Sequence, residues 1–191
     1  MTRIIAGSAG GRRLRTPSGR ETRPTTDRVR EALFSAIETW AGGWDDLRVL
    51  DLYAGSGALG LEAWSRGARE VLLVESDRRT AGVIAGNIRD LGADAARVVA
   101  SPVAGLLARG GEGAFDLVLS DPPYPLPEAA VAADLALLVE HGWLAADALV
   151  VVERSSRSPE PTWPTGLVEP SRRKYGETTL WSAHTPPATD R

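Results

Sequence analysis

The segment SDPPYP, residues 120–125, places a carboxylate, two consecutive prolines and an aromatic ring directly after an apolar run. Neither proline can donate a hydrogen bond to a strand ladder, so a strand over residues 115–120 should end here. The prolines would hold the Asp121 carboxylate and the Pro122 carbonyl rigidly, with Pro123 and the Tyr124 ring beside them. Taken alone, the segment fits both a turn with a solvated aspartate and a rigid active-site loop.

A glycine-rich segment, GSGALG at residues 55–60, is the second feature with chemical meaning. Gly55 and Gly57 begin a Gly-x-Gly-x-x-Gly pattern between an apolar run and a helical one. Such a loop lets a ligand approach the backbone at a helix N-terminus. Glu75 ends the next apolar run, 20 residues after Gly55, and a carboxylate there can accept hydrogen bonds from both ribose hydroxyls. The pattern predicts an adenosine-containing cofactor.

Asp51, four residues before Gly55, helps to distinguish between such cofactors. A dinucleotide would place its pyrophosphate at the helix N-terminus, where the carboxylate would repel it. A cationic ligand, such as the ammonium group of S-adenosylmethionine, suits this carboxylate better. Asp51 can also cap the amides of the loop itself, and the two roles are compatible.

The composition predicts one domain with a possible small appendage. The chain has 191 residues, of which 43% are hydrophobic, which is ample for one core. No apolar run could span a bilayer and no signal-peptide pattern is present, so a soluble, cytoplasmic and monomeric protein is the default expectation. Cysteine is absent, which excludes disulfides, and the two histidines lack metal-ligand spacing, so no metal is expected.

A basic N-terminal segment contrasts with an acidic body. Residues 1–30 carry a net charge of +6 and the remaining 161 residues carry −9. This asymmetry suggests a polyanionic partner, although a charge run is also typical of a solvated tail. Two short extended stretches around a glycine-containing turn predict a basic β-hairpin within residues 1–24. The candidate contacts to such a partner are Arg3, Arg12, Arg13, Arg15, Arg23 and Arg28.

Strands and helices alternate along the rest of the chain. A helix should begin near Thr26 or Asp27 and run to about Trp40, because apolar residues recur there at helical spacing. Further helices should follow the first three strands and cover residues 127–140. Six strands are expected, at residues 48–53, 70–76, 96–101, 115–120, 148–155 and 177–184. This alternation predicts a mostly parallel sheet with helices on both faces, and the last strand should be antiparallel because a proline-rich loop, not a helix, precedes it.

Several motifs together carry a family resemblance. The chain resembles class I S-adenosylmethionine-dependent methyltransferases that modify exocyclic amines of nucleobases, through Asp51, the glycine loop, Glu75 and DPPY. The stretches RPTTDRVREALFSAI and LDLYAGSGALGLEAWSRGA, in this order before DPPY, narrow the resemblance to the RsmD-type 16S rRNA guanine-N2 methyltransferases, over about residues 3–183.

The resemblance implies a Rossmann-like methyltransferase domain over residues 25–184, with a mostly parallel seven-stranded sheet and an antiparallel last strand. A basic N-terminal RNA-binding arm at residues 1–24 and a flexible tail at residues 185–191 would flank it. It also implies S-adenosylmethionine as cofactor and guanine N2 of 16S rRNA, in the small ribosomal subunit or its assembly intermediate, as target. Ser101 would contact adenine, although many related enzymes have an acid there.

The same resemblance gives the DPPY loop its role. A base amine is a poor nucleophile because its lone pair is delocalised into the ring. The Asp121 carboxylate and the Pro122 carbonyl would hold the amine hydrogens and favour the geometry of attack, while Tyr124 would stack on the base. A base within a helix would first be extruded.

Three alternatives stay open. A DNA or RNA methyltransferase acting on adenine N6 or cytosine N4 would use the same loop, but DNA amine methylases usually carry a separate target-recognition domain, and only about 36 residues follow the fifth strand. A non-catalytic ribosome-assembly factor would keep the pocket as a relic. An NAD-dependent dehydrogenase would rest on the glycine loop alone.

Overall fold

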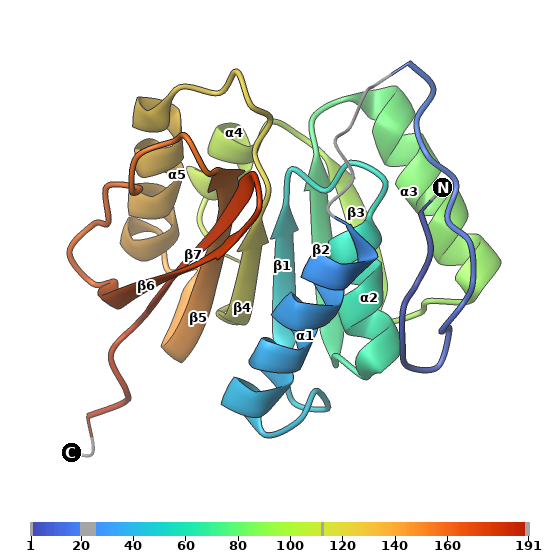
Figure 1. Cartoon of the computed structure of the whole chain (residues 1–191), viewed down its shortest axis with the longest axis horizontal. Helices are drawn as coiled ribbons and strands as arrows, with labels where there is room; N and C mark the ends of the chain where they lie inside the picture. The colour runs from blue at the N-terminus through green and yellow to red at the C-terminus, as the bar shows by residue number, and fades with distance from the viewer. Residues whose placement is uncertain (1, 20–25, 112, 190–191) are drawn as a thin grey trace.

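One seven-stranded sheet organises the protein (Figure 1). The computed structural model describes residues 2–19, 26–111 and 113–189. The strand order is β3-β2-β1-β4-β5-β7-β6; β1 to β5 are parallel, and β7 is antiparallel to both of its neighbours. The strands are β1 Arg48–Leu52, β2 Glu70–Glu75, β3 Ala96–Ala100, β4 Phe115–Ser120, β5 Leu144–Ser155, β6 Val168–Tyr175 and β7 Thr178–His184.

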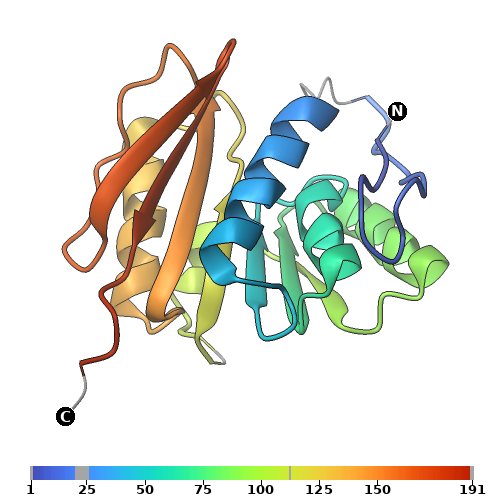
Figure 2. The same cartoon turned by 60° about the horizontal axis from the view of Figure 1, so that its bottom comes forward.

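Helices cover both faces of this sheet, as Figures 1 and 2 show. The helices are α1 Asp27–Ala41, α2 Ala58–Arg66, α3 Arg78–Leu91, α4 Val103–Leu107 and α5 Glu128–Glu140. The first three pack on one face and the last two on the other. Alternate residues of the central strands supply the two cores: Val49 of β1 faces α1 to α3, whereas Leu50 faces α4 and α5.

Local sequence signals explain where α1 begins and ends. The Thr26 side chain caps the helix by accepting a hydrogen bond from the Val29 amide at 3.3 Å, which satisfies one of the free amides of the first turn. Gly42 ends the helix in a left-handed conformation. None of the described helices is long and apolar enough to cross a membrane.

The sequence-based expectations for the sheet are confirmed, with one omission. All six expected strands are present, and the last strand is antiparallel. The omitted strand is β6, which lies where only a proline-rich loop and a gap were expected. β6 contains Pro170 and three consecutive cations, and it buries almost none of its surface, so it lacks the apolar pattern by which strands are recognised.

The N-terminal segment, residues 2–19, packs beside α2 and α3 (Figure 2). One isolated antiparallel bridge joins Arg3 to Arg13, and the chain turns between them. The expected two-stranded β-hairpin is therefore not confirmed. Ile4 and Leu14 are buried, so this segment is attached to the body through apolar contacts as well as hydrogen bonds.

Candidate active site

Four carboxylates stand at the carboxyl ends of adjacent parallel strands. Asp51 is the next-to-last residue of β1, Glu75 ends β2, Asp121 follows β4, and Glu153 lies near the end of β5. The strand register brings them into one row, because Leu52 is aligned with Val74 and with Ser120, and Ser120 with Val152. This edge of an open α/β sheet is where ligands bind.

Asp51 is buried within this row. One of its carboxylate oxygens accepts a hydrogen bond from the Gly60 amide at 2.9 Å, so the capping role considered for it is present. Burial raises the pKa of Asp51 to about 7, the Gly60 bond opposes the rise, and the nearby Glu75 carboxylate adds to it. A positively charged ligand beside Asp51 would relieve this cost of burying a charge.

Glu75 orders the glycine loop from the neighbouring strand. Its carboxylate accepts hydrogen bonds from the amides of Gly55 and Asp77, each at 3.0 Å. These two bonds hold the glycine loop against the end of β2. Gly55 adopts a φ of 59°, and a side chain built on it would meet no atom within 4 Å. The loop therefore leaves open space beside Gly55.

Gly57 and Ser101 complete the set predicted to contact the cofactor. Gly57 is buried and occupies the N-cap position of α2. Ser101 is also buried, directly after β3, and its amide donates to the Glu75 carbonyl at 3.0 Å. The Ser101 hydroxyl donates to the Pro102 carbonyl and accepts a hydrogen bond from Arg109 at 3.2 Å. The structure thus brings all five predicted residues to the carboxyl edge of β1 to β3.

The DPPY loop leaves the same edge at β4. Burial raises the pKa of Asp121 well above its ordinary range; Glu153 and Asp51 add to the rise, and Arg154 opposes it. Pro122 is buried and Pro123 is exposed, while Tyr124 is 50% exposed. A large aromatic ring exposed beside a partly buried carboxylate is unusual for a purely structural turn.

Three residues that support the site, Tyr53, Asp134 and Arg154, were not singled out from the sequence. The Tyr53 hydroxyl donates to the Asp134 carboxylate of α5, although Tyr53 follows β1 with a φ of 59°, which is rare for an aromatic residue. The buried Arg154 donates to the Leu126 carbonyl at 3.3 Å and pairs with Glu128, and so ties the end of the DPPY loop to β5.

Glu153 is the missed residue that sequence reasoning could have found. The apolar runs of β1, β2, β4 and β5 all lead into an acidic residue, and in a parallel sheet these ends meet at one edge. Tyr53, Asp134 and Arg154 had no comparable signal, because their partners lie 26 or more residues away.

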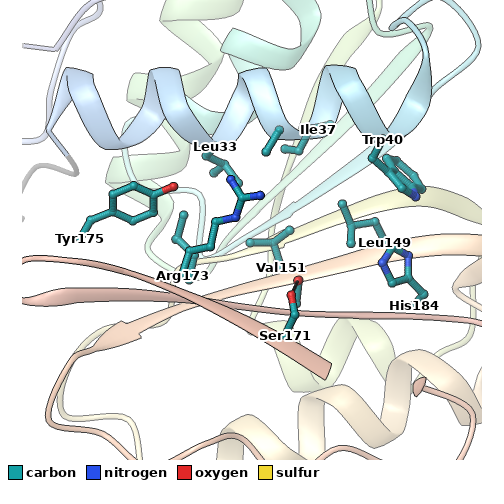
Figure 3. Close-up of a pocket in the computed structure, with 12 residues that line it drawn as sticks. Leu33, Ile37, Trp40, Leu149, Val151, Ser171, Arg173, Tyr175 and His184 are labelled. Carbon is teal, nitrogen blue, oxygen red and sulfur yellow. Dashed lines mark hydrogen bonds between the residues drawn. The ribbon is translucent and has the colours of Figure 1, made fainter. Parts of the chain in front are cut away.

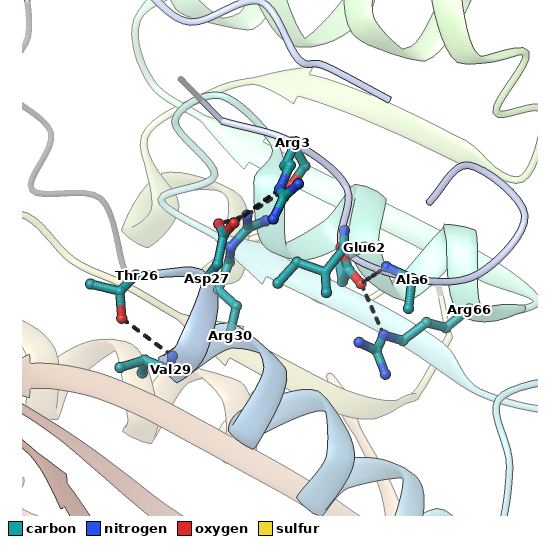
Figure 4. Close-up of polar contacts among 9 residues, drawn as sticks. Arg3, Ala6, Thr26, Asp27, Val29, Arg30, Glu62 and Arg66 are labelled. Carbon is teal, nitrogen blue, oxygen red and sulfur yellow. Dashed lines mark hydrogen bonds and ion pairs between the residues drawn. The ribbon is translucent and has the colours of Figure 1, made fainter. Parts of the chain in front are cut away.

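Interactions with the body fix the N-terminal segment in place (Figure 4). The fully buried Glu62 carboxylate accepts hydrogen bonds from the amides of Ile5 and Ala6, at 2.7 and 3.0 Å, and from Arg66. Arg3 forms an ion pair with Asp27 at 3.0 Å. The segment is consequently a fixed part of the surface and not a loose arm.

The six arginines predicted to contact RNA differ in the hydrogen bonds and ion pairs that they form within the protein. Arg12 donates to the Asp90 carbonyl at 2.8 Å, and Arg15 pairs with the Asp90 carboxylate at 2.8 Å. The side chains of Arg13 and Arg28 are exposed and form no hydrogen bond or ion pair within the described residues. Arg23 lies outside the described residues. The cations available to an external phosphate are therefore fewer than the sequence count implies.

The geometry supports two chemical functions. The row of carboxylates, with one main cationic neighbour in Arg154 among the described residues, suits a ligand that carries positive charge and hydroxyl groups. The rigid loop that follows β4 adds an acceptor pair and an exposed ring for a planar second ligand.

Comparisons with known proteins agree with this arrangement. Residues 2–184 match the family described as Conserved hypothetical protein 95. The chain is 42% identical over 162 residues to Ribosomal RNA small subunit methyltransferase D of Escherichia coli K12, which covers 85% of this chain and 79% of the relative. It is 35% identical over 179 residues to YlbH of Bacillus subtilis 168, provisionally named an rRNA methyltransferase, with 92% and 95% covered.

Solved structures share the fold along nearly the whole chain. The Escherichia coli protein yhhF, provisionally named a methyltransferase, superimposes with a TM-score of 0.84 at 35% identity, over 98% of this chain and 99% of that one. A hypothetical protein of Thermus thermophilus gives a TM-score of 0.79 at 34% identity, over 97% and 99%. The seven-stranded sheet with its antiparallel β7 is thus the class I methyltransferase fold.

Proposed function

The chain belongs to the Conserved hypothetical protein 95 family, and we propose that it transfers a methyl group from S-adenosylmethionine to the N2 amine of a guanine in 16S ribosomal RNA. The observation that carries the proposal is the row of carboxylates leading to the rigid Asp121 loop at one edge of the sheet. The relatives named as rRNA methyltransferases support the RNA substrate. A ribosomal substrate makes the cytoplasm the site of action.

The residues at the carboxyl edge fit S-adenosylmethionine. Asp51 attracts its ammonium group, Glu75 accepts hydrogen bonds from the ribose hydroxyls, and Ser101 lies beside the adenine. Gly55 lets it approach the backbone, because a Cβ there would meet no atom within 4 Å. A Cβ on Gly57 would instead meet the core side chains of Leu61, Leu73 and Ile84 at 3.2–3.3 Å, so Gly57 supports the site by allowing the loop to pack closely. When bound, the cofactor supplies an electrophilic methyl group on a sulfonium sulfur and leaves as the neutral thioether.

The DPPY loop prepares the amine for attack. The Asp121 carboxylate and the Pro122 carbonyl accept the two amine hydrogens, and Tyr124 stacks on the base, so the nitrogen lone pair is directed at the methyl group. Because N2 would gain the methyl group, the methylated nitrogen would have to give up one proton. Asp121 receives this proton, because burial and the neighbouring Glu153 raise its pKa.

Mass spectrometry of modified nucleosides tests the proposal directly. The purified chain is incubated with S-adenosylmethionine that carries an isotopic methyl label, together with either naked small-subunit rRNA or small subunits from cells that lack the protein. The digested RNA should contain labelled N2-methylguanosine. Labelled N6-methyladenosine or N4-methylcytidine would contradict the guanine target. If neither substrate received a labelled methyl group, the proposal that the protein is a methyltransferase would be contradicted. The two substrates also show whether ribosomal proteins must shape the target.

A further inference from the structure

The outermost strand of the sheet carries a cluster of cations that the site described above does not use. β6 lies at the end of the strand order, and seven of its eight residues are exposed. Arg172, Arg173 and Lys174 follow one another in it, whereas the chain after residue 30 carries a net charge of −9. Charged residues on an edge strand prevent unwanted pairing with other sheets, which accounts for charge there but not for the groove beside it.

An apolar groove runs between this strand and α1 (Figure 3). Leu33 and Ile37 of α1 line one side, and Arg173 and Tyr175 of β6 stand on the other. The cavity volume is about 170 Å³, which is below the range of about 300–1,000 Å³ typical of small-molecule sites. The groove is therefore suited to part of a longer ligand and not to an enclosed small molecule.

The side chains of β6 alternate between the two faces of the sheet. Arg173 and Tyr175 line the groove, whereas Arg172 lies over the Trp181 ring at 5.7 Å, on the other face. Among the residues that the structure describes, none forms a hydrogen bond or an ion pair with the Arg173 guanidinium. The groove thus combines an uncommitted cation with an aromatic ring and an apolar floor.

Strand register places the mouth of the groove beside the candidate active site. Arg173 is aligned with Leu180, and Leu180 with Glu153, the outermost acid of the carboxylate row. Tyr175 lies two residues further toward the carboxyl edge, where it pairs with Thr178 and through it with Ser155. A polymer bound at the DPPY loop could therefore continue into the groove without crossing the sheet.

We propose that this groove binds a single-stranded RNA segment that adjoins the methylated nucleotide, with one base stacked on Tyr175 and a phosphate held by Arg173. The inference rests on the proposed function, since it assumes an RNA substrate. An aromatic platform next to a cation is the usual arrangement for unpaired nucleotides, and the planar guanidinium suits a phosphate. Because the bases of a duplex are stacked on one another, the groove discriminates in favour of unpaired RNA.

The test measures binding of the full-length protein, without cofactor, to a fluorescent single-stranded RNA of mixed sequence and to the same RNA annealed to its complement. For the single strand, Tyr175→Ala should weaken binding about 5- to 150-fold, the loss of one stacked base. Arg173→Ala should reduce the slope of log affinity against log salt by about 0.7, the loss of one phosphate contact on a single strand. Tyr175→Phe should retain affinity, and Arg173→Lys should retain the salt slope.

Arg69→Ala is the matched control, because Arg69 is exposed directly before β2, at the amino ends of the parallel strands and separated from β6 by four strands in the sheet order. Arg69→Ala should leave both the affinity for the single-stranded RNA and the slope of log affinity against log salt unchanged. Equal effects of Arg69→Ala and Arg173→Ala would overturn the proposal, as would unchanged single-strand binding in both groove variants. Loss of duplex binding alone would overturn it too. Cofactor-dependent methyl transfer is measured separately, so a wild-type protein that binds the single strand through the groove but transfers no methyl group would contradict the proposed function and not the groove.

Discussion

At the scale of single residues, Asp51 should make cofactor binding depend on pH. Burial, with a contribution from Glu75, raises its pKa to about 7 in the free protein. A cationic ligand prefers the ionised carboxylate, so the affinity for S-adenosylmethionine should rise with pH up to about 7 and level off above it. Below the pKa the change should approach about tenfold per pH unit for one linked proton. Calorimetric titrations across this range measure the profile.

Asp51→Asn is the control for this profile. Asparagine keeps an acceptor for the Gly60 amide but has no titrating charge. The variant should therefore bind S-adenosylmethionine more weakly than the wild type, with an affinity that does not depend on pH near 7. A wild-type profile that stays flat from pH 6 to 8 would exclude Asp51 as the partner of the ligand's positive charge.

Asp51 should also lower the free energy of unfolding of the free protein at pH values above its pKa. Its folded pKa is raised above the unfolded value, so the stability it contributes is full below about pH 4 and is lost as pH rises through about 7. Asp51→Asn should therefore stabilise the free protein at pH 8, by about 1–3 kcal/mol, and change little at pH 4. Denaturant unfolding at the two pH values measures the difference. A variant less stable than the wild type at pH 8 would contradict the cost assigned to the buried charge.

Asp121 should act on the rate and not on cofactor affinity. In the proposed reaction its carboxylate holds and polarises the amine only when RNA is present, so Asp121→Ala should lower methyl transfer about 10²–10³-fold. S-adenosylmethionine binding should stay near normal. Single-turnover transfer and a cofactor titration on the same preparation separate the two quantities. Undiminished transfer by this variant would remove the proposed mechanism whatever the cofactor result.

At the scale of elements, the N-terminal segment depends on a close approach to α2. Gly7 adopts a φ of 82°, and a Cβ built on it would lie 1.9 Å from the Ser65 carbonyl oxygen. This contact is too short, so the backbone of the N-terminal segment or that of α2 would have to move. Gly7→Ala should displace the segment from the body, weaken RNA binding and lower its salt slope, while cofactor binding stays unchanged. RNA titrations against salt, with limited proteolysis of the segment, measure these effects.

Gly11→Ala provides a matched control for Gly7→Ala. Gly11 has the same φ of 82°, but a Cβ there would meet no atom within 4 Å, so both variants share the backbone strain and only one has the clash. Similar losses of RNA binding in both would assign the effect to strain in the turn and not to attachment on α2.

The sequence predicted the elements whose signals are local and missed those whose signals are not. The buried strands are short apolar runs that end at turn residues, and their bounds agree with the structure within a few residues. β6 was missed because an exposed edge strand needs no apolar face. The N-terminal hairpin was expected from glycines and arginines, whereas the conformation depends on Glu62, Ser65 and Asn87, more than 50 residues away.

The candidate site and the basic segment likewise contain residues that local motifs predicted and a residue whose role depends on the fold. Asp51, Gly55, Glu75 and Asp121 were predicted from motifs, and the structure gathers them at one edge of the sheet; their roles stay predictions. Arg30 was counted in the basic segment, but it is 2% exposed and donates to the Arg3 carbonyl and to Asp27. Sequence alone cannot separate a cation that binds a ligand from one that holds the fold.

At the scale of the whole molecule, the acids of the candidate site and the cations proposed to bind RNA differ in burial. Asp51 and Glu75 of the row are buried and Asp121 and Glu153 are partly buried, whereas Arg13, Arg28 and Arg173 are exposed on the N-terminal segment, α1 and β6. Salt screens exposed charges strongly and buried ones weakly. Binding of the cofactor and binding of RNA should therefore respond differently to the same change in ionic strength.

Thermal unfolding in the presence of each ligand tests this separation. S-adenosylmethionine at 100 times its Kd should stabilise the protein by about 2.7 kcal/mol, which raises Tm by about 5–11 °C in a chain of this size, and added salt should change this shift little. RNA should also raise Tm, but its contribution should decline steeply with salt because it depends on exposed arginines. Glu75→Ala should remove most of the cofactor shift and leave the RNA shift, whereas Arg13→Ala should lower the RNA shift and leave the cofactor shift, since the Arg13 side chain forms no hydrogen bond or ion pair with a described residue of the pocket. If either substitution abolished both shifts, the N-terminal segment and the pocket would act as one binding unit, and the division between a buried acidic site and an exposed basic surface would be wrong.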